Sequence, residues 1–138
     1  YPDLNLSTAS DIDWETEYVD LILSIKTVKS AEEVVEHISQ FGSKHTEAIV
    51  TENSELAEWF MNTVDAAGVF WNASTRFADG FRYGFGAEVV VSTGKTHARG
   101  PVGLEGLVIY KYKLYGNGHV AGSYGKGKKE FIHQEIKL

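Results

Sequence analysis

The stretch Ser30-Ala-Glu-Glu-Val-Val-Glu-His-Ile-Ser-Gln-Phe-Gly-Ser-Lys-His-Thr-Glu-Ala-Ile-Val-Thr51 carries the signals of a helix followed by a strand. Ser30 and Glu33 have the spacing of a capping box, in which hydroxyl and carboxylate satisfy the first free amides of a helix. Apolar residues then recur at helical spacing, and Gly42 supplies the stop. The short apolar run Ala48–Thr51 predicts a strand directly after this helix.

The segments on either side extend this pattern into an alternation of strands and helices. Upstream, residues 19–28 are a nearly continuous apolar run, typical of a strand buried on both faces. Downstream, residues 56–64 carry the apolar stripe of a second helix, capped by Asn53 or Ser54, and residues 67–71 predict a third strand. The order β-α-β-α-β requires a parallel sheet with right-handed crossovers, so the fold class is α/β.

The chain changes character after Trp71. Residues 72–106 are glycine-rich and polar, and they predict a long functional loop. Residues 107–115 then alternate with period two, which predicts a half-exposed strand. Such a strand either lies at the edge of a sheet or pairs with another chain.

Composition excludes several classes of function. The 138 residues carry a net charge of −6, with fifteen acids and four bases in residues 1–79 (−11) and four acids and nine bases in residues 80–138 (+5). The acidic total gives no support for nucleic-acid binding, and no apolar run approaches the length of a membrane span. The basic half either attracts an anionic small molecule or docks against the acidic half. Because the chain has no cysteine, it has no disulfide framework.

The sequence lacks a complete P-loop and a histidine pattern typical of metal sites. Gly94-Lys95-Thr96 matches the end of a P-loop, but that loop needs a glycine five positions before Gly94, where this chain has Val89. The five histidines show no i,i+4 pairing and no His-Glu-x-x-His element, so we expect no metal site.

The strongest candidate for a ligand site is the loop Asn72–Gly80. It places an amide, two hydroxyls and a guanidinium, from Asn72, Ser74, Thr75 and Arg76, directly after an apolar strand. In α/β proteins ligands bind beyond the carboxyl ends of the strands, and arginine suits bidentate recognition of carboxylate or phosphate. Alternatively, Asp79 pairs with Arg76 and neutralises it.

A second polar segment, Gly42–Glu47, joins the first helix to the second strand. We favour a polar turn there, because such turns lie on the face opposite the ligand crevice. The functional alternative is that His45 or Glu47 helps to position a loop near a bound ligand.

Five segments of the chain together resemble one enzyme family. They are Asp13–Tyr18, Glu36–Ile49, Asn72–Phe77, Gly84–Glu88 and His97–Pro101. In this order they resemble the C-terminal part of γ-glutamyl phosphate reductase, also called glutamate-5-semialdehyde dehydrogenase, in the aldehyde dehydrogenase superfamily. The basic, glycine-broken tail is most similar to that of the stand-alone fungal enzymes.

This resemblance implies reduction of γ-glutamyl phosphate to glutamate-5-semialdehyde by NADPH, a step of proline biosynthesis in the cytoplasm. A cysteine thiolate displaces phosphate to give a thioester, which a hydride then reduces. The family's cysteine and cofactor domain both precede the part that this chain resembles. We therefore expect no catalytic residue in this chain and no activity from the chain alone.

The resemblance also implies which residues meet the ligands. The substrate-binding residues it implies are Asn72, Ser74, Thr75, Arg76 and Arg99. Glu17 stands where superfamily relatives place a glutamate that contacts the nicotinamide ribose. Residues 1–106 would then be part of the catalytic, substrate-side domain. Residues 107–138 would be a C-terminal oligomerisation strand and tail, with residues 107–115 joining a homo-oligomer.

One departure from the family pattern concerns the second loop, and two other readings of the chain stay open. Family members usually carry glycine where this chain has Val90, and a Cβ there would not suit a backbone with positive φ. Within the enzyme class, the chain alternatively belongs to a bifunctional pyrroline-5-carboxylate synthase. Outside that class, it is a non-catalytic α/β assembly module.

Overall fold

The computed structural model describes residues 6–135. Its internal contacts divide the chain into two compact units, with the division between Val108 and Ile109. The two predicted domains also include residues 1–5 and 136–138, which lie outside the described residues. The functional roles of the two predicted domains stay a prediction.

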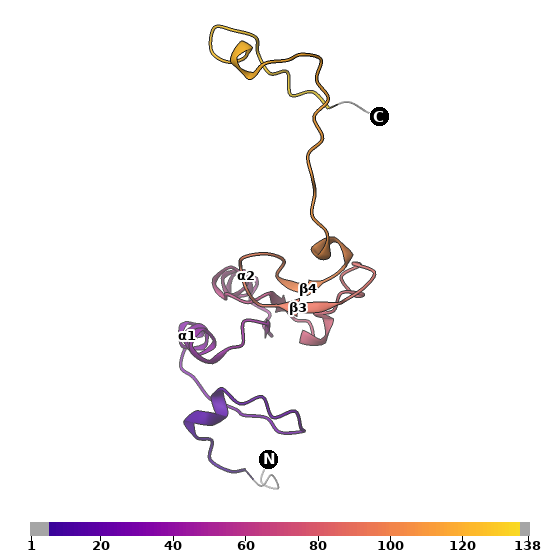
Figure 1. Ribbon diagram of the computed structural model, residues 1–138. Helices are drawn as coiled ribbons and strands as arrows, with labels where there is room; N and C mark the ends of the chain where they lie inside the picture. The colour runs from indigo at the N-terminus through magenta and orange to yellow at the C-terminus, as the bar shows by residue number, and fades with distance from the viewer. Residues whose placement is uncertain (1–5, 136–138) are drawn as a thin grey trace. The chain divides into compact units, whose positions relative to one another are not determined.

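The first unit is built around two parallel strands, β1 (Thr46–Ile49) and β2 (Gly68–Trp71), which pair in register from Thr46 opposite Gly68 to Ile49 opposite Trp71. Helix α1 (Ala31–Phe41) precedes β1, and helix α2 (Ser54–Thr63) connects the strands. Figure 1 labels both helices. Both helices and both strands were predicted, within three residues at each end. The α/β fold class is confirmed.

The ends of α1 follow from its capping residues. The Ser30 hydroxyl accepts a hydrogen bond from the Glu33 amide at 3.3 Å, whereas the Glu33 carboxylate accepts one from the Lys29 amide at 3.0 Å. At the other end Gly42 has an ordinary φ of −68°. A Cβ at Gly42 would nevertheless lie 2.5 Å from the Ile38 carbonyl oxygen. Glycine is therefore required there by close approach and not by a left-handed backbone.

Helix α2 and its C-cap residue Val64 supply most of the buried apolar side chains. Its cap is Asn53, whose side-chain oxygen accepts a hydrogen bond from the Leu56 amide at 3.0 Å. The fully or nearly buried hydrophobic residues of the described chain are Ala57, Phe60, Val64 and Val102. The core is thus centred on α2 and its C-cap, and α2 contacts both β2 and α1.

The predicted first strand, residues 19–28, is wrong for this structure. The segment forms no helix or strand, and Leu21, Leu23 and Ile25 are almost wholly exposed. A strand buried on both faces needs neighbouring strands and covering layers to satisfy its backbone and its side chains. Residues 6–135 supply neither to this segment, so the parallel sheet has two strands instead of three.

Residues 72–106 are more ordered than the predicted loop. They contain a short antiparallel pair, β3 (Val90–Ser92) and β4 (Gly100–Val102), with Val90 opposite Val102. The 3-10 turns Thr75–Phe77 and Leu104–Leu107 flank this pair. Val90 begins a strand and has no positive φ, so its Cβ meets no backbone conflict.

The predicted strand at residues 107–115 is not formed within this chain. Leu107 ends a 3-10 turn, and residues 108–115 form no strand, with Ile109 and Tyr112 each about nine-tenths exposed. An isolated strand has no partner for its backbone groups, so alternation alone does not make one. Pairing with another chain stays a prediction.

The second unit also contains a small aromatic group. A 3-10 turn, Ala121–Ser123, precedes Tyr124, whose ring stacks on Phe131 at 5.0 Å between centroids.

Among the helices that the structure describes in either unit, none is long and apolar enough to cross a membrane.

Candidate functional site

A polar cavity of about 800 Å³ in the first unit brings together three of the predicted ligand residues. Glu17 reaches it from the segment before α1, and Thr75 and Arg76 reach it from the turn after β2. In the sequence, Glu17 lies almost sixty positions before Thr75 and Arg76. The cavity is therefore the place where the acidic N-terminal segment meets the loop predicted from the sequence.

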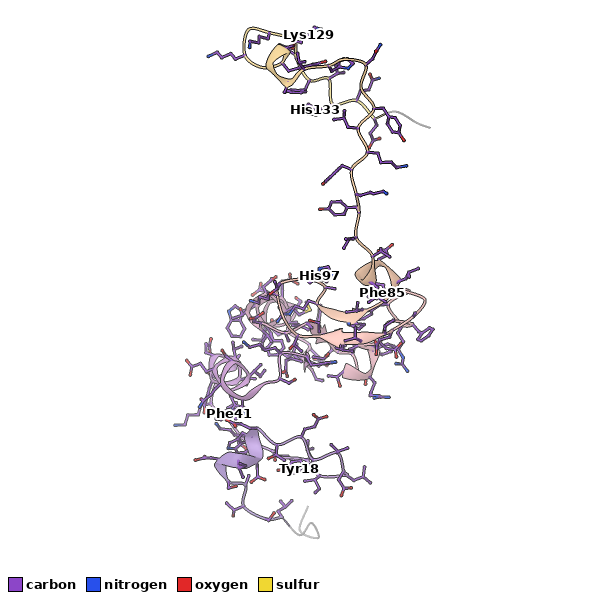
Figure 2. All side chains as sticks on the ribbon, viewed as in Figure 1. Tyr18, Phe41, Phe85, His97, Lys129 and His133 are labelled. Carbon is purple, nitrogen blue, oxygen red and sulfur yellow. The ribbon has the colours of Figure 1, made fainter. Side chains whose placement is uncertain are left out.

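The N-terminal segment is held against α1 by aromatic side chains. Trp14 lies edge-on to the His37 ring of α1, with 5.3 Å between ring centroids, and His37 contacts Phe41 at 4.8 Å. Burial, together with the Lys26 ammonium 3.2 Å from Nδ1, lowers the pKa of His37. Tyr18 and Phe41 mark these two segments in Figure 2. This packing places Glu17 on the cavity wall.

A hydrogen bond closes the same segment around Glu17. The Tyr18 hydroxyl donates to the Asp13 carboxylate and lies 2.9 Å from the Ser24 hydroxyl. The bond from Tyr18 is the main cause that lowers the pKa of Asp13, and the same bond raises the pKa of Tyr18. Asp13 and Tyr18 thus fix the chain on both sides of Glu17.

Asn72 has a structural task at the carboxyl ends of the strands. Its side-chain oxygen accepts from the Thr51 amide and its side-chain nitrogen donates to the Thr51 carbonyl, both at 2.9 Å. Its own amide donates to the Ile49 carbonyl at 2.9 Å, and its φ of 51° turns the chain away from β2. The amide extends the pairing of β1 and β2 by one step.

Ser74 caps the turn that carries Arg76 but lines a different cavity. The Ser74 hydroxyl accepts from the Arg76 amide at 3.2 Å and so caps the turn Thr75–Phe77. Asn72 and Ser74 line a second, open cavity of about 660 Å³ beyond the strand ends, and neither lines the cavity of Arg76. The four predicted substrate residues of this loop are thus divided between two cavities.

Asp79 pairs with Arg82 and not with Arg76. An Arg82 nitrogen lies 3.2 Å from the Asp79 carboxylate, and the same nitrogen donates to the Arg76 carbonyl oxygen at 2.9 Å. Within residues 6–135 the Arg76 guanidinium forms no ion pair, so the proposed neutralisation by Asp79 is wrong. The sequence signal for Arg82 was its i,i+3 spacing from Asp79.

Glu88 closes the loop on the far side of Arg82. Its carboxylate accepts a hydrogen bond from the Gly80 amide at 2.8 Å. Gly80 is buried, and a Cβ there would lie 2.5 Å from the Ala87 carbonyl oxygen. Residues 79–88 therefore form a closed loop along one wall of the cavity.

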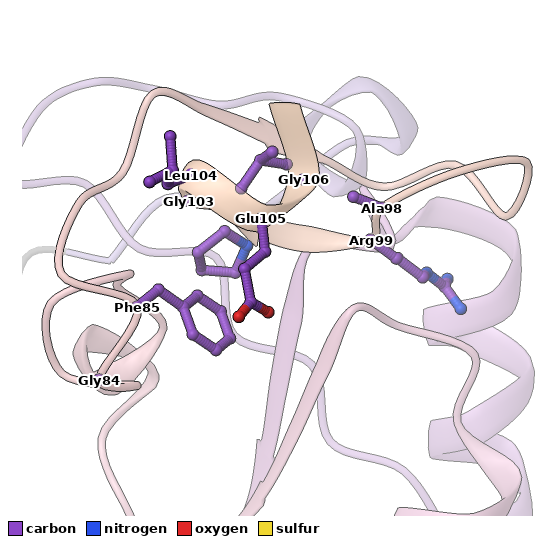
Figure 3. A pocket seen from close by; sticks show the side chains of 10 residues that line it. Gly84, Phe85, Ala98, Arg99, Gly103, Leu104, Glu105 and Gly106 are labelled. Atoms are coloured by element: carbon purple, nitrogen blue, oxygen red, sulfur yellow. The ribbon is translucent and has the colours of Figure 1, made fainter. Parts of the chain in front are cut away.

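Arg99 lies on a different cavity. This hollow of about 470 Å³ is also lined by Phe85 and Glu105, and Figure 3 shows the Arg99 guanidinium pointing away from the Glu105 carboxylate. The guanidinium donates to the Asp65 carboxylate at 2.8 Å and to the Asp65 carbonyl at 3.4 Å. Its Nε is buried and has no partner in the described chain.

Asp65 holds two cations at once. Lys95 lies 2.8 Å from one carboxylate oxygen and Arg99 lies 2.8 Å from the other. Their hydrogen bonds, that of Lys95 first, lower the pKa of Asp65 to about 2. The pair ties the β3–β4 hairpin to the end of α2, a link that the sequence did not predict.

His45 and Glu47 differ in their relation to the site. His45 lines the cavity of Arg76, and its Nδ1 lies 2.7 Å from the Thr46 hydroxyl. Glu47 is half-buried outside the lining, and burial raises its pKa. The polar turn before β1 therefore contributes to the cavity through His45. No group of His, Asp or Glu in the described residues is arranged to hold a metal ion.

Comparisons with known proteins identify relatives of the chain. No family model matches it. A γ-glutamyl phosphate reductase of Acetivibrio thermocellus is 57% identical over 131 residues, which are 95% of this chain and 30% of the relative. A probable γ-glutamyl phosphate reductase of Schizosaccharomyces pombe is 58% identical over 130 residues, which are 93% of this chain and 29% of the relative.

A solved structure agrees with these relatives. The crystal structure of γ-glutamyl phosphate reductase from Thermotoga maritima superposes with a TM-score of 0.79 at 50% identity, over 84% of this chain and 28% of that one. The chain spans about 30% of the length of the relatives it matches. Over almost its whole length, the chain is therefore similar to one segment of the γ-glutamyl phosphate reductases.

Proposed function

We propose that this chain is a C-terminal segment of an enzyme that reduces γ-glutamyl phosphate to glutamate-5-semialdehyde, with NADPH as the reductant. In the balanced reaction, a thiolate elsewhere in the protein displaces phosphate, hydride from NADPH reduces the resulting thioester, and the thiolate leaves as the aldehyde is released. The role of this segment is to bind the anionic substrate and to form one wall of the active site.

The observation that carries the proposal is the meeting of Glu17 and Arg76 on one cavity. One carries the carboxylate assigned to the cofactor and the other carries a guanidinium assigned to the substrate. The Arg76 guanidinium is exposed and forms no ion pair in the described part of the chain, so it is available to an anion. The substrate carries both carboxylate and phosphate groups, which arginine binds well.

The residues present fit one part of the cofactor. A carboxylate accepts hydrogen bonds from ribose hydroxyls, and Glu17 presents one at the wall of a polar cavity. When bound, NADPH supplies the hydride. In this segment, the Glu17 carboxylate accepts hydrogen bonds from those hydroxyls. The remaining contacts to the cofactor belong to the part of the protein beyond this chain.

The other predicted residues have graded roles. Thr75 lines the same cavity as Arg76 and offers a hydroxyl to the substrate. Ser74 caps the turn and Asn72 joins the strands, so each holds the loop in place as well as lying near it. Arg99 lines a separate cavity, and its ion pair with Asp65 orients its guanidinium there. The proposal also includes a cytoplasmic homo-oligomer that pairs through residues 107–115.

The test uses Arg76→Ala in the full-length protein that contains this segment. Phosphate-dependent oxidation of the semialdehyde by NADP⁺ reports the same site in reverse and gives separate KM values for all three substrates. We expect the KM for phosphate or for the semialdehyde to rise about tenfold or more, because a charged hydrogen bond is lost. Arg76→Lys keeps the charge and should lose less.

Lys126→Ala is the matched control, since it removes an exposed cation from the second unit. It should leave all three KM values unchanged. Unaltered kinetics in the Arg76→Ala variant would contradict the assignment of Arg76. Such a result, together with an intact oligomer, would favour the non-catalytic assembly module.

A further inference from the structure

We infer that Arg82 is a positioning residue that holds the Arg76 loop in its substrate-binding form. The inference rests on the proposed function of Arg76. In the sequence, the i,i+3 spacing from Asp79 is the one signal for Arg82. Its assignment comes from the hydrogen bonds that its guanidinium makes.

The Arg82 guanidinium joins two points of the loop. One nitrogen donates to the Arg76 carbonyl oxygen at 2.9 Å and lies 3.2 Å from the Asp79 carboxylate. The carbonyl belongs to the very residue whose guanidinium is assigned to the substrate. Arg82 thus fixes the backbone from which the Arg76 side chain extends.

Asp79 is itself held by the backbone of the same loop. Its Oδ1 accepts from the amides of Phe81 and Arg82, at 2.9 and 3.1 Å. Its other oxygen faces the Arg82 guanidinium. Asp79 therefore orients Arg82 through a local turn. Arg82 in turn fixes the position of the Arg76 carbonyl through its hydrogen bond.

The loop is closed beyond Arg82 as well. The Glu88 carboxylate accepts from the Gly80 amide at 2.8 Å, and both Glu88 and Arg82 line the cavity of Arg76. With Gly80 buried against Ala87, residues 79–82 have a fixed base. Arg82 is the link between this base and the Thr75–Phe77 turn.

The charges show why Arg82 and Arg76 have different tasks. The positive charge of Arg82 faces the Asp79 carboxylate, whereas Arg76 has no acidic partner among residues 6–135. An anionic substrate is attracted to the uncompensated guanidinium. Arg82 then acts on the substrate only through the position of Arg76.

The experiment is a double-mutant cycle in the full-length protein. Arg76→Ala, Arg82→Ala and the double variant are compared in phosphate-dependent oxidation of the semialdehyde, with the thermal midpoint of each variant recorded. We expect Arg82→Ala to raise, by about fivefold, the same KM that Arg76→Ala raises, with the KM for NADP⁺ unchanged. In the Arg76→Ala background the second substitution should add nothing, because the group it positions is gone.

Arg82→Lys tests the geometry of the link. A lysine ammonium keeps the charge beside Asp79 but lacks the planar fork of arginine. Arg82→Lys should therefore raise the substrate KM less than Arg82→Ala does. A purely stabilising role would instead lower the thermal midpoint and change all the KM values together.

The outcomes separate the two claims. If Arg76→Ala raises a substrate KM and Arg82→Ala does not, the positioning role is wrong while the proposed function stands. Additive effects in the double variant would also overturn the positioning role. If Arg76→Ala itself changes no KM, the binding role of Arg76 fails and the inference about Arg82 fails with it.

Discussion

The side-chain amide of Asn72 forms a two-bond pair with the backbone of Thr51. Oxygen accepts from the Thr51 amide and nitrogen donates to the Thr51 carbonyl, both at 2.9 Å. The pair continues the parallel ladder past the end of β1 with a side chain in place of a strand residue. It sets the direction in which the chain enters the loop of Ser74 and Arg76.

Asn72→Ala should therefore destabilise the protein by about 2 kcal/mol, through two lost hydrogen bonds and an unfavourable left-handed backbone. Asn72→Gly removes the same bonds but tolerates the φ of 51°, so it should cost less. Thermal unfolding of the full-length variants measures both. Equal stability of the alanine variant and the natural protein would refute a structural role for this amide.

Gly42 offers a second test of backbone packing. Gly42→Ala places a Cβ 2.5 Å from the Ile38 carbonyl oxygen and should cost about 1–3 kcal/mol, because the helix end must shift. Gly94→Ala is the matched control, since its nearest neighbour is the Ser92 hydroxyl at 3.7 Å. Chemical denaturation compares the two variants. A Gly94→Ala variant as unstable as Gly42→Ala would show that the contact with the Ile38 carbonyl is not the cause of the loss.

Sequence and structure agree where the chain's own local signals decide the outcome. The Ser30 cap, the Asn53 cap and the spacing of Phe60 and Val64 define two helices without help from distant residues. Short apolar runs correctly placed β1 between the two helices and β2 after α2. Agreement on the α/β class follows from these elements.

Disagreement occurs where a segment needs a partner. Residues 19–28 and 107–115 have the composition of strands, but a strand forms only beside another strand. The link from Arg82 to Arg76 and that from Arg99 to Asp65 depend on where loops meet in space. Periodicity does not report such meetings, although the Asp79–Arg82 spacing gave a hint.

The two ion pairs of Asp65 predict a pH dependence of stability. Its pKa falls from 3.8 to about 2 in the folded protein, so the folded state favours the ionised carboxylate. The resulting stabilisation is fully present above the unfolded pKa and is lost as the pH falls from about 4 towards about 2. Asp65→Asn should differ in stability from the natural protein at pH 7, and the difference should shrink over that acid range.

High salt provides the control for Asp65, because its side chain is 46% exposed and its ion pairs are open to screening. Denaturation at several pH values, with and without added salt, measures the difference between the two proteins. A difference that stays constant from pH 7 down to pH 2 would argue against the ion pairs as its source.

Pairing through residues 107–115 predicts the effect of a proline. Tyr112→Pro removes a backbone donor from the middle of the segment and should dissociate the full-length oligomer. Tyr112→Thr keeps a residue that suits strands and should leave the oligomer intact. Light scattering on the eluted protein gives the mass of each variant. If the proline variant keeps its full oligomeric mass, assembly uses another surface.

The most direct test of the central proposal is turnover by the full-length protein that contains this segment. With γ-glutamyl phosphate and NADPH, we predict oxidation of NADPH matched by equal amounts of phosphate and glutamate-5-semialdehyde. The 138-residue chain alone should show none, because it contains no cysteine. A folded full-length protein that consumes no NADPH with this substrate, or turnover by the 138-residue chain alone, would contradict the account.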